Sequence, residues 1–392
     1  MARRESFAVG IGALRVSKVH MKPLPFRCVY RNFALATLLA GCGSSSAATP
    51  PGGTGDASPD SFAPADAGTG GQGGGAGPEA GPDGSSDAAA DSGADATDGG
   101  APSLTARTAA VQQTIATDPL CTALPAFYWE IGDASGALTS GAVGKTFAAD
   151  TQMDIASASK LVFGAYVVER FASDLSAMDA SAMRMLSGYT SLVYSTCVRS
   201  SSVSACFDAS SNATLTSADV GHFFYNGGHF QKYAVDLGLG GDDDAALTAD
   251  IKSKVGTEFS FVYSSPQLAG GIKTSASDYA AFLRKILSGG LAIHEHLGEN
   301  PVCTQPSSCS TALYSPAPAA WHYSYAHWVE DDPATGDGAF SSPGAFGFYP
   351  WIDATRTYYG IVARYSLATQ AYIESAECGA KIRKAFVSGE VQ

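Results

Sequence analysis

Hydrophobic and polar positions in residues 104–392 alternate between helix-like and strand-like patterns. Residues 126–133 and 137–147 are strand-like runs joined by a short Gly/Asp/Ser turn, which is typical of a β-hairpin. A second pair of strand-like runs, 344–353 and 357–366, lies near the end of the sequence. Strand pairs at both ends with helices between them favour an α/β or α+β fold, in which one sheet is completed by both ends of the domain.

The pattern between and beside these strands predicts helices. Apolar residues recur at helical spacing in SASDYAAFLRKILSGG, between a serine cap and a glycine. LVFGAYVVERF is apolar on nearly every side, which indicates a helix buried in the domain. Helices and loops are expected in residues 172–222, which are rich in Ser, Ala and Met. We also predict helices at residues 104–117 and about 371–388.

The first 42 residues have the layout of an export signal. From Met21 on, Lys22, Arg27 and Arg31 precede a short apolar run at 33–40, which is too short to span a bilayer. The sequence Leu-Ala-Gly-Cys that follows resembles a bacterial lipoprotein signal, in which Cys42 becomes the lipidated first residue. Met21 is the more natural start. We therefore expect an exported protein, anchored by lipid in the bacterial cell envelope, at the outer membrane or cell surface; the alternative is an ordinary signal peptide with an incidental Cys42.

Residues 43–103 are predicted to form a disordered tether. They consist mainly of Gly, Ala, Asp, Ser, Thr and Pro, with one aromatic residue and no Lys or Arg, so they cannot bury enough apolar surface to fold. Eight Asp and one Glu in this segment carry −9 of the net charge of −13, which leaves −4 elsewhere. The acidity therefore belongs to the tether. No basic cluster with interleaved aromatic residues is present, so nucleic-acid binding is not expected.

The cysteine pattern suggests disulfides rather than metal binding. Besides Cys28 and Cys42 the chain has six cysteines, and an even number in an exported protein suggests three disulfides, with 15 connectivities open. No CxxC pair and no HExxH motif occurs, so neither a zinc site nor another cofactor is expected. His294-Glu295-His296 is better explained as a solvated loop or helix end.

The segment IASASKLV holds the candidate chemistry. Ser157 and Lys160 are three residues apart, so they share one face of a helix. A lysine amine has a pKa of about 10.4 in water, and burial lowers it. A neutral amine could take the proton of Ser157 and let its oxygen attack a carbonyl. The alternative is a capped helix start whose lysine extends to solvent, and this spacing also arises by chance.

Four segments together resemble the penicillin-recognising serine hydrolases, which include serine β-lactamases, D,D-peptidases and related esterases. IASASKLV resembles the nucleophile motif, and HFFYNGGHFQKYAVDLGL the segment with the family tyrosine. AGGIKTSASDYAAFLRKIL resembles a helix of the class C-like branch, and SSPGAFGFYPWIDATRTYYGIVARY the third motif with the next strand. The similarity covers nearly all of residues 104–392. It implies an antiparallel five-stranded sheet flanked by helices, with an inserted, mostly helical subdomain.

The resemblance also implies roles for individual residues. Ser157 corresponds to the nucleophile, Lys160 to the base, and Tyr225 to the tyrosine that assists proton transfer to the leaving group. The backbone N–H groups of Ser157 and Ala345 would form the oxyanion hole. Tyr263 is a rival for the tyrosine role, but Tyr225 is followed at the family distance by LGL and a helix-like stretch.

Two motifs depart from the family pattern. The second reads Tyr-Asn-Gly at 225–227, so Asn226 is one place early. The third reads Ser-Pro-Gly at 342–344, without the Lys or His that helps relatives hold a substrate carboxylate. Ser342 would offer a neutral hydrogen bond instead, so weak turnover of β-lactams is expected. Asn226, Ser342 and Gly344 are the candidate substrate-binding residues, while Ser159 and His229 could line the site or serve as capping or loop residues.

The leading interpretation is a lipid-anchored, monomeric serine hydrolase acting through an acyl-enzyme on a small-molecule or peptide-like ester or amide. One alternative is a catalytically degenerate binding lipoprotein of the same fold, and another is a peptidoglycan D,D-peptidase or β-lactamase. For the disulfides, Cys197–Cys206 and Cys303–Cys309 are expected because each pair is close in sequence. The third, Cys121–Cys378, follows from the implied fold, in which the terminal helices pack together.

Overall fold

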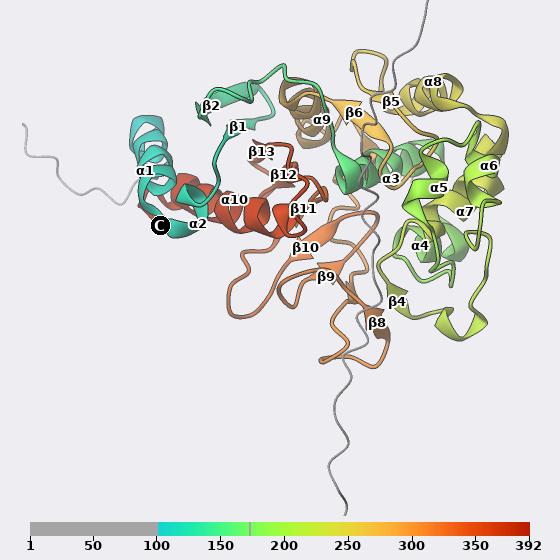
Figure 1. Cartoon of the computed structure of the whole chain (residues 1–392). Helices are drawn as coiled ribbons and strands as arrows, with labels where there is room; N and C mark the ends of the chain where they lie inside the picture. The colour runs from blue at the N-terminus through green and yellow to red at the C-terminus, as the bar shows by residue number, and fades with distance from the viewer. Residues whose placement is uncertain (1–100, 172–173) are drawn as a thin grey trace, which may run out of the picture. The chain divides into compact units, whose positions relative to one another are not determined.

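A computed structural model describes residues 101–171 and 174–392 (Figure 1). Several predictions lie outside these residues: the signal peptide with Met21, the lipidation site Cys42, and nearly all of the tether. The α-helices are α1 (Leu104–Thr117), α2 (Pro119–Thr122), α3 (Ser159–Arg170), α4 (Ala177–Met183), α5 (Tyr194–Cys197), α6 (Val203–Phe207), α7 (Gly228–Asp236), α8 (Asp244–Val255), α9 (Ala276–Leu287) and α10 (Ala371–Ser388). No helix of the described ranges combines the length and the apolar character needed to cross a bilayer.

Most strands belong to one antiparallel sheet. The strands are β1 (Phe127–Asp133), β2 (Gly136–Val143), β3 (Met153–Asp154), β4 (Phe223–Phe224), β5 (Val262–Tyr263), β6 (Ile272–Thr274), β7 (Val302–Cys303), β8 (Ala312–Tyr314), β9 (His322–Tyr323), β10 (Trp328–Glu330), β11 (Ala339–Ser341), β12 (Tyr349–Ile352) and β13 (Tyr359–Ala363). The sheet order is β2-β1-β13-β12-β11-β10-β9-β7. β1 pairs with β13, which confirms that strands from both ends of the domain complete one sheet.

The sheet has eight strands where five were expected. The order β2-β1-β13-β12-β11 contains the two predicted strand pairs, and the short strands β10, β9 and β7 extend it at the β11 edge. Two smaller sheets, β3-β6-β5 and β4-β8, lie outside it. The fold class, an antiparallel sheet with helices, is as expected.

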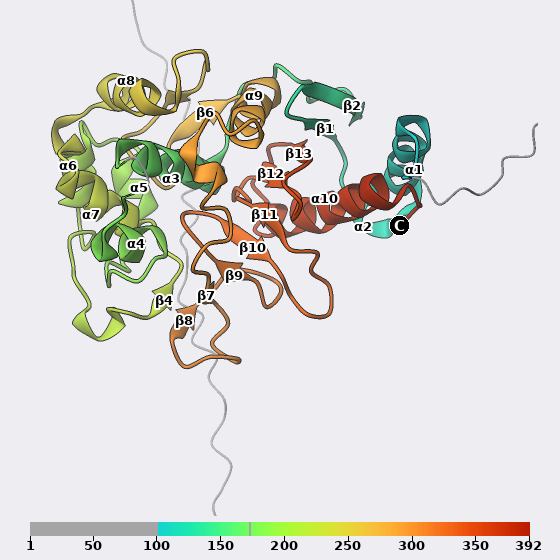
Figure 2. The ribbon, with the colours of Figure 1, turned by 180° about the vertical axis from the view of Figure 1, so that it is seen from behind.

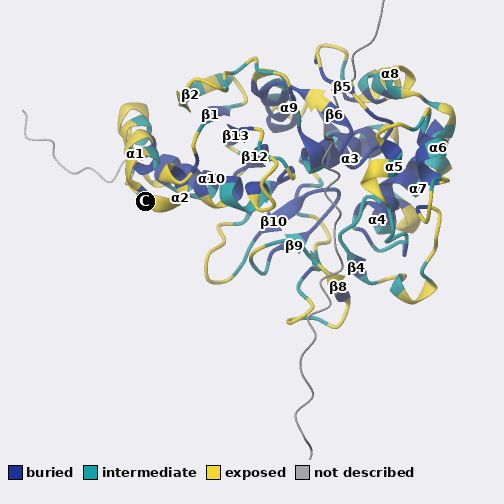
Figure 3. Cartoon of the chain, viewed as in Figure 1, coloured by how far each residue is buried: buried dark blue, intermediate teal, exposed yellow. Residues whose placement is uncertain are grey.

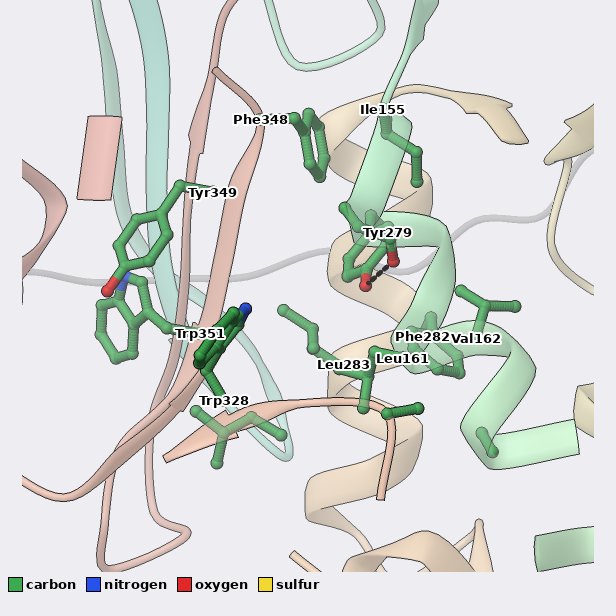
Figure 4. Packing of buried hydrophobic residues seen from close by; sticks show 14 of the residues in the cluster. Ile155, Leu161, Val162, Tyr279, Phe282, Leu283, Trp328, Phe348, Tyr349 and Trp351 are labelled. Atoms are coloured by element: carbon green, nitrogen blue, oxygen red, sulfur yellow. Dashed lines mark hydrogen bonds between the residues drawn. The ribbon is translucent and has the colours of Figure 1, made fainter. Parts of the chain in front are cut away.

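Helices α9 and α10 cover opposite faces of the sheet (Figures 1 and 2). Arg284 of α9 donates to the Tyr359 hydroxyl at 2.8 Å. Arg383 of α10 donates to the hydroxyl of Tyr349, whose cross-strand partner is Val362. Because side chains alternate along a strand, positions 359 and 362 of β13 face opposite sides. Figure 4 shows Tyr349 across the strands from the apolar residues of α9.

The first and last helices of the described domain pack together. The Arg107 guanidinium donates to the Phe386 carbonyl at 2.9 Å, and the Gln392 amide donates to Thr114 Oγ1 at 3.0 Å. A disulfide joins α2 to α10 through Cys121 and Cys378, whose Cα atoms are 4.8 Å apart. The pairing expected from the fold is therefore present.

The helix that carries the lysine is buried, as its apolar pattern predicted. Every residue of α3 from Ser159 to Val168 is buried, and Figure 3 shows this helix dark among its neighbours. The other two expected disulfides are also formed. Cys197–Cys206 joins α5 to α6, and Cys303–Cys309 closes the loop after β7, with Cα separations of 4.5 and 6.4 Å.

Candidate active site

Ser157 lies at a sharp turn between a strand and a helix. β3 ends at Asp154, the Ile155 amide donates to the Ile272 carbonyl, and a 3-10 turn at Ala156–Ala158 leads directly into α3. Ala156 has a φ of 46°, a left-handed conformation that costs free energy for a residue with a side chain. The turn presents Ser157 to a cleft of about 410 Å³.

Lys160 is buried beside Ser157. Its Nζ lies 2.8 Å from Ser157 Oγ and donates to the Ala269 carbonyl, also at 2.8 Å. The residue is 4% exposed, and burial lowers the pKa of its amine to about 7. A large part of the amine population is therefore neutral at physiological pH and can accept a proton.

Tyr225 reaches the same cleft. Its ring stacks on Trp328 with centroids 5.1 Å apart, and Lys160 Nζ lies 4.9 Å from the Tyr225 centroid. Burial raises the pKa of Tyr225 to about 12, although a hydrogen bond with the Ser157 side chain acts in the opposite direction. The phenol therefore keeps its proton at neutral pH and can donate it in a hydrogen bond.

The rival Tyr263 does not line this cleft. It lies on β5 and is buried, and its hydroxyl has no hydrogen-bond partner among the residues that the structure describes. Burial raises the pKa of Tyr263 far above the usual tyrosine value.

The hairpin between β11 and β12 supplies the second half of the candidate oxyanion hole. Gly347 donates to the Gly344 carbonyl at 2.8 Å, which closes a tight turn with Ala345 exposed at its tip. Within the described ranges, no acceptor is hydrogen-bonded to the Ala345 amide. A Cβ on Gly344 would lie 2.0 Å from the Ile155 carbonyl oxygen, so only glycine allows the hairpin to pack this closely beside the turn that holds Ser157.

Ser342 was expected to bind substrate, but its hydroxyl is bonded to the protein backbone. Its hydroxyl donates to the Ser157 carbonyl at 3.0 Å, the residue is 3% exposed, and it is not among the residues that line the cleft. Ser342 therefore ties the hairpin to the turn that carries Ser157.

Asn226 lines the cleft, and its oxygen is already engaged. Oδ1 accepts from the Leu192 amide at 3.0 Å and from the Gly228 amide at 2.8 Å. These two bonds assign the orientation of the side-chain amide, because a nitrogen in that place could not accept them. The side-chain NH₂ is the group left for a ligand.

Ser159 and His229 are structural. Ser159 Oγ donates to the Ala156 carbonyl and accepts from the Ile272 amide. Both ring nitrogens of His229 are bonded, one to Ser187 and one to the Phe224 carbonyl, and burial lowers its pKa to about 4. In residues 101–171 and 174–392, no group of three His, Cys, Asp or Glu side chains could hold a metal ion.

Other residues that line the cleft include Leu192, Tyr194, Gln267 and Phe346, none of which the sequence singled out. Leu192 and Tyr194 come from the segment expected to form helices and loops, where no local pattern points to a site. Phe346 follows Ala345 at the tip of the hairpin. Gln267 precedes the AGG phrase, and its only signal is a polar residue between Pro and Leu.

Comparison with known proteins gives no match by sequence and clear matches by structure. No model of a known protein family matches the sequence, and no curated protein matches it. The octameric penicillin-binding protein homologue from Pyrococcus abyssi aligns at a TM-score of 0.51 with 13% identity, covering 74% of this chain and 78% of that protein. The D-amino acid amidase from Ochrobactrum anthropi SV3, in complex with L-phenylalanine, aligns at 0.50 with 11% identity, covering 71% and 98%.

The chain has the β-lactamase/D,D-peptidase fold. The resemblance noted in the sequence implies catalytic roles for Ser157, Lys160 and Tyr225, and the structure brings these three residues to one cleft. Ala345 and Asn226 line the same cleft.

Proposed function

We propose that the protein is a serine hydrolase that cleaves an ester or amide through an acyl-enzyme. The observation that carries this proposal is the 2.8 Å contact between Ser157 Oγ and the buried Lys160 amine, whose pKa of about 7 makes it a usable base. A lysine that only capped a helix would extend its amine to solvent.

In the acylation step, Ser157 Oγ attacks the carbonyl carbon of the substrate and its proton passes to Lys160 Nζ. Negative charge then develops on the carbonyl oxygen, where the N–H groups of Ser157 and Ala345 stabilise it. The leaving group departs with a proton supplied through Tyr225 from the protonated lysine. Lys160 is neutral again when the ester to Ser157 has formed.

Deacylation reverses these roles with water as the nucleophile. The neutral Lys160, with Tyr225, takes a proton from water, and the resulting oxygen attacks the acyl carbon. The bond to Ser157 Oγ breaks, and Ser157 recovers its proton from Lys160. Water and acyl-enzyme thus give a carboxylic acid and the starting enzyme.

The charge of the cleft favours an uncharged substrate. Of the described residues that line it, only Lys160 is charged, and its amine is engaged by Ser157 and Ala269. Since Ser342 does not line the cleft, no described residue there replaces the cation with which relatives hold a carboxylate. This supports a general acyl hydrolase over a β-lactamase or D,D-peptidase.

We also propose that the protein is exported and anchored by lipid on Cys42, on the grounds of its N-terminal sequence. A binding lipoprotein without activity remains the alternative of a different class, since two of the three motifs are altered.

The deciding experiment measures hydrolysis of a short p-nitrophenyl ester by the wild type and by Ser157→Ala, with labelling by a fluorophosphonate probe. We expect turnover and labelling in the wild type and neither in the variant. Lys160→Ala should lose nearly as much activity as Ser157→Ala, and the double variant no more, because the two residues act as one unit. Ester hydrolysis that survives in purified Ser157→Ala would refute the mechanism.

A further inference from the structure

Gln267 is a buried polar side chain in the wall of the cleft. The residue is 2% exposed, and it lines the cleft together with Ser157 and Lys160. Among the residues that the structure describes, none forms a hydrogen bond with its carboxamide. The buried Gln231, by contrast, donates to two carbonyls and accepts from an amide.

The carboxamide lies beside the nucleophile turn. A Cβ on Gly270 would be 2.8 Å from Gln267 Oε1 and 3.7 Å from the Ala156 carbonyl carbon. Gly270 has no positive φ that would require glycine. The missing side chain at position 270 therefore leaves space for the Gln267 oxygen next to the residue that precedes Ser157.

The backbone around Gln267 is held firmly. Its amide donates to the Ser265 carbonyl at 2.7 Å, and its own carbonyl accepts from Gly271 at 2.8 Å. Two residues on, the Ala269 carbonyl accepts from Lys160. The loop that fixes the lysine thus also fixes the position from which the Gln267 side chain extends.

Neither polar atom of the Gln267 carboxamide is among the described buried polar atoms that lack a partner, so the group is in contact with the solvent of the cleft. A substrate that fills the cleft removes this solvent, and the carboxamide is then left unpaired unless the substrate offers a matching group. Gln267 offers an acceptor oxygen and an NH₂ donor. An amide N–H complements the oxygen, which lies beside the turn that carries Ser157, and an uncharged amide suits a cleft whose lysine is already hydrogen-bonded.

We propose that Gln267 is a specificity-determining residue that accepts a hydrogen bond from an amide N–H in the acyl part of the substrate. The substrate class is then an N-acylated amino-acid or peptide-like ester or amide, in which this second amide lies close to the bond that is cleaved. The inference rests on the proposed function, because it concerns the substrate of the same cleft.

Two esters that differ in one group test the inference. The p-nitrophenyl ester of N-acetylglycine has an N–H where the ester of 4-oxopentanoic acid has a CH₂. In the wild type, kcat/KM should favour the N-acetylglycine ester by about ten-fold, the value of one hydrogen bond. Gln267→Leu, which keeps the volume and removes the polar groups, should reduce this preference several-fold, because kcat/KM falls more for the N-acetylglycine ester than for the 4-oxopentanoate ester.

Fluorophosphonate labelling of Ser157 establishes that the variant is folded, and Gln113→Leu, at an exposed position of α1, is the matched control. If the ratio of kcat/KM for the two esters is unchanged in Gln267→Leu, because both values stay the same or fall equally, the inference is overturned and the proposed function is not. If Gln267→Leu is not labelled by the fluorophosphonate, Gln267→Met is measured in its place, and the same ratio of kcat/KM decides. Absence of turnover and labelling in the wild type overturns the proposed function and the inference with it.

Discussion

Lys160 has its amine removed from water with no carboxylate beside it. Burial is the one cause of its lowered pKa, and among the described residues its two hydrogen bonds go to neutral oxygens. The same burial that makes the amine a base at neutral pH also penalises the folded state. Catalysis and stability therefore depend on this residue in opposite directions.

The pH dependence of turnover follows from the pKa of about 7. The base must be neutral, so kcat/KM should fall about ten-fold per pH unit below pH 7 and level off above it. A profile measured with a p-nitrophenyl ester between about pH 5 and 9 checks this. A flat profile across pH 7, or an acid limb near pH 4, would show that a different group is the base.

Lys160→Met should stabilise the protein while it abolishes turnover. Between the folded pKa of about 7 and the unfolded value of about 10.4, the unfolded chain binds more protons, so stability rises with pH over this window and the penalty is complete below pH 7. Methionine has a similar length and no charge. Thermal unfolding at pH 7 should show a higher Tm, at roughly 2–4 °C per kcal/mol.

The difference in Tm between Lys160→Met and the wild type should shrink as the pH approaches 10. If Lys160→Met melts below the wild type at pH 7, the hydrogen bonds of the lysine amine to Ser157 and Ala269 stabilise the fold by more than the desolvation of that amine destabilises it.

The contact between Ser157 and Lys160 could be predicted from the sequence, because their spacing along one helix determines it. The sequence could not show that Ser342 donates to the Ser157 carbonyl, because that contact joins residues 185 positions apart. For Gln267 the decisive facts are burial and the absence of a described partner, and neither has a local signature.

At the scale of elements, the hairpin of β11 and β12 and the turn before α3 form the site by packing against each other. Their contact is close because Gly344 lies directly against the Ile155 carbonyl. A Cβ at position 344 would force the hairpin away and move the Ala345 amide with it.

Gly344→Ala should therefore reduce kcat by about 10²-fold or more, the usual effect of misplacing reacting groups by about 1 Å. Gly136→Ala is the matched control, since it changes a hairpin glycine with nothing within 4 Å of the added Cβ. Ester kinetics on both variants, with Tm for each, check this. Equal activity in the two would contradict the role of the hairpin.

Element boundaries were predictable where the chain supplies its own signals. The predicted helices 104–117 and 371–388 coincide with α1 and α10, since a serine cap begins the first and a glycine ends the second. The short strands β9 and β10 were not predicted. They have two and three residues, so no alternation can develop, and their conformation is determined by pairing, of β10 with β11 and of β9 with β10.

On the scale of the whole domain, the disulfide between Cys121 and Cys378 closes a loop of 257 residues. Replacing both cysteines by alanine should lower the free energy of unfolding by about 2–5 kcal/mol. Turnover at 25 °C should stay within about two-fold, because neither residue lines the cleft. Denaturant unfolding followed by fluorescence measures the loss.

The control is the pair Cys303 and Cys309, which are 6 residues apart. Since the entropy of loop closure grows with loop length, removing this pair should cost less. A larger loss from the short loop would contradict the entropic account.

The contact between the first and last described helices has a consequence for the order of the sequence. Pro102 lies against Gly389, and the Gln392 amide reaches Thr114, so the two ends of the domain are neighbours in space. A short Gly/Ser linker could join them, and the chain could be reopened at the exposed Gly289–Gly290 after α9. In the circular permutant, the hairpin of β11 and β12 would precede α3 along the chain, whereas it follows α3 in the natural order. The sheet and the cleft would be the same.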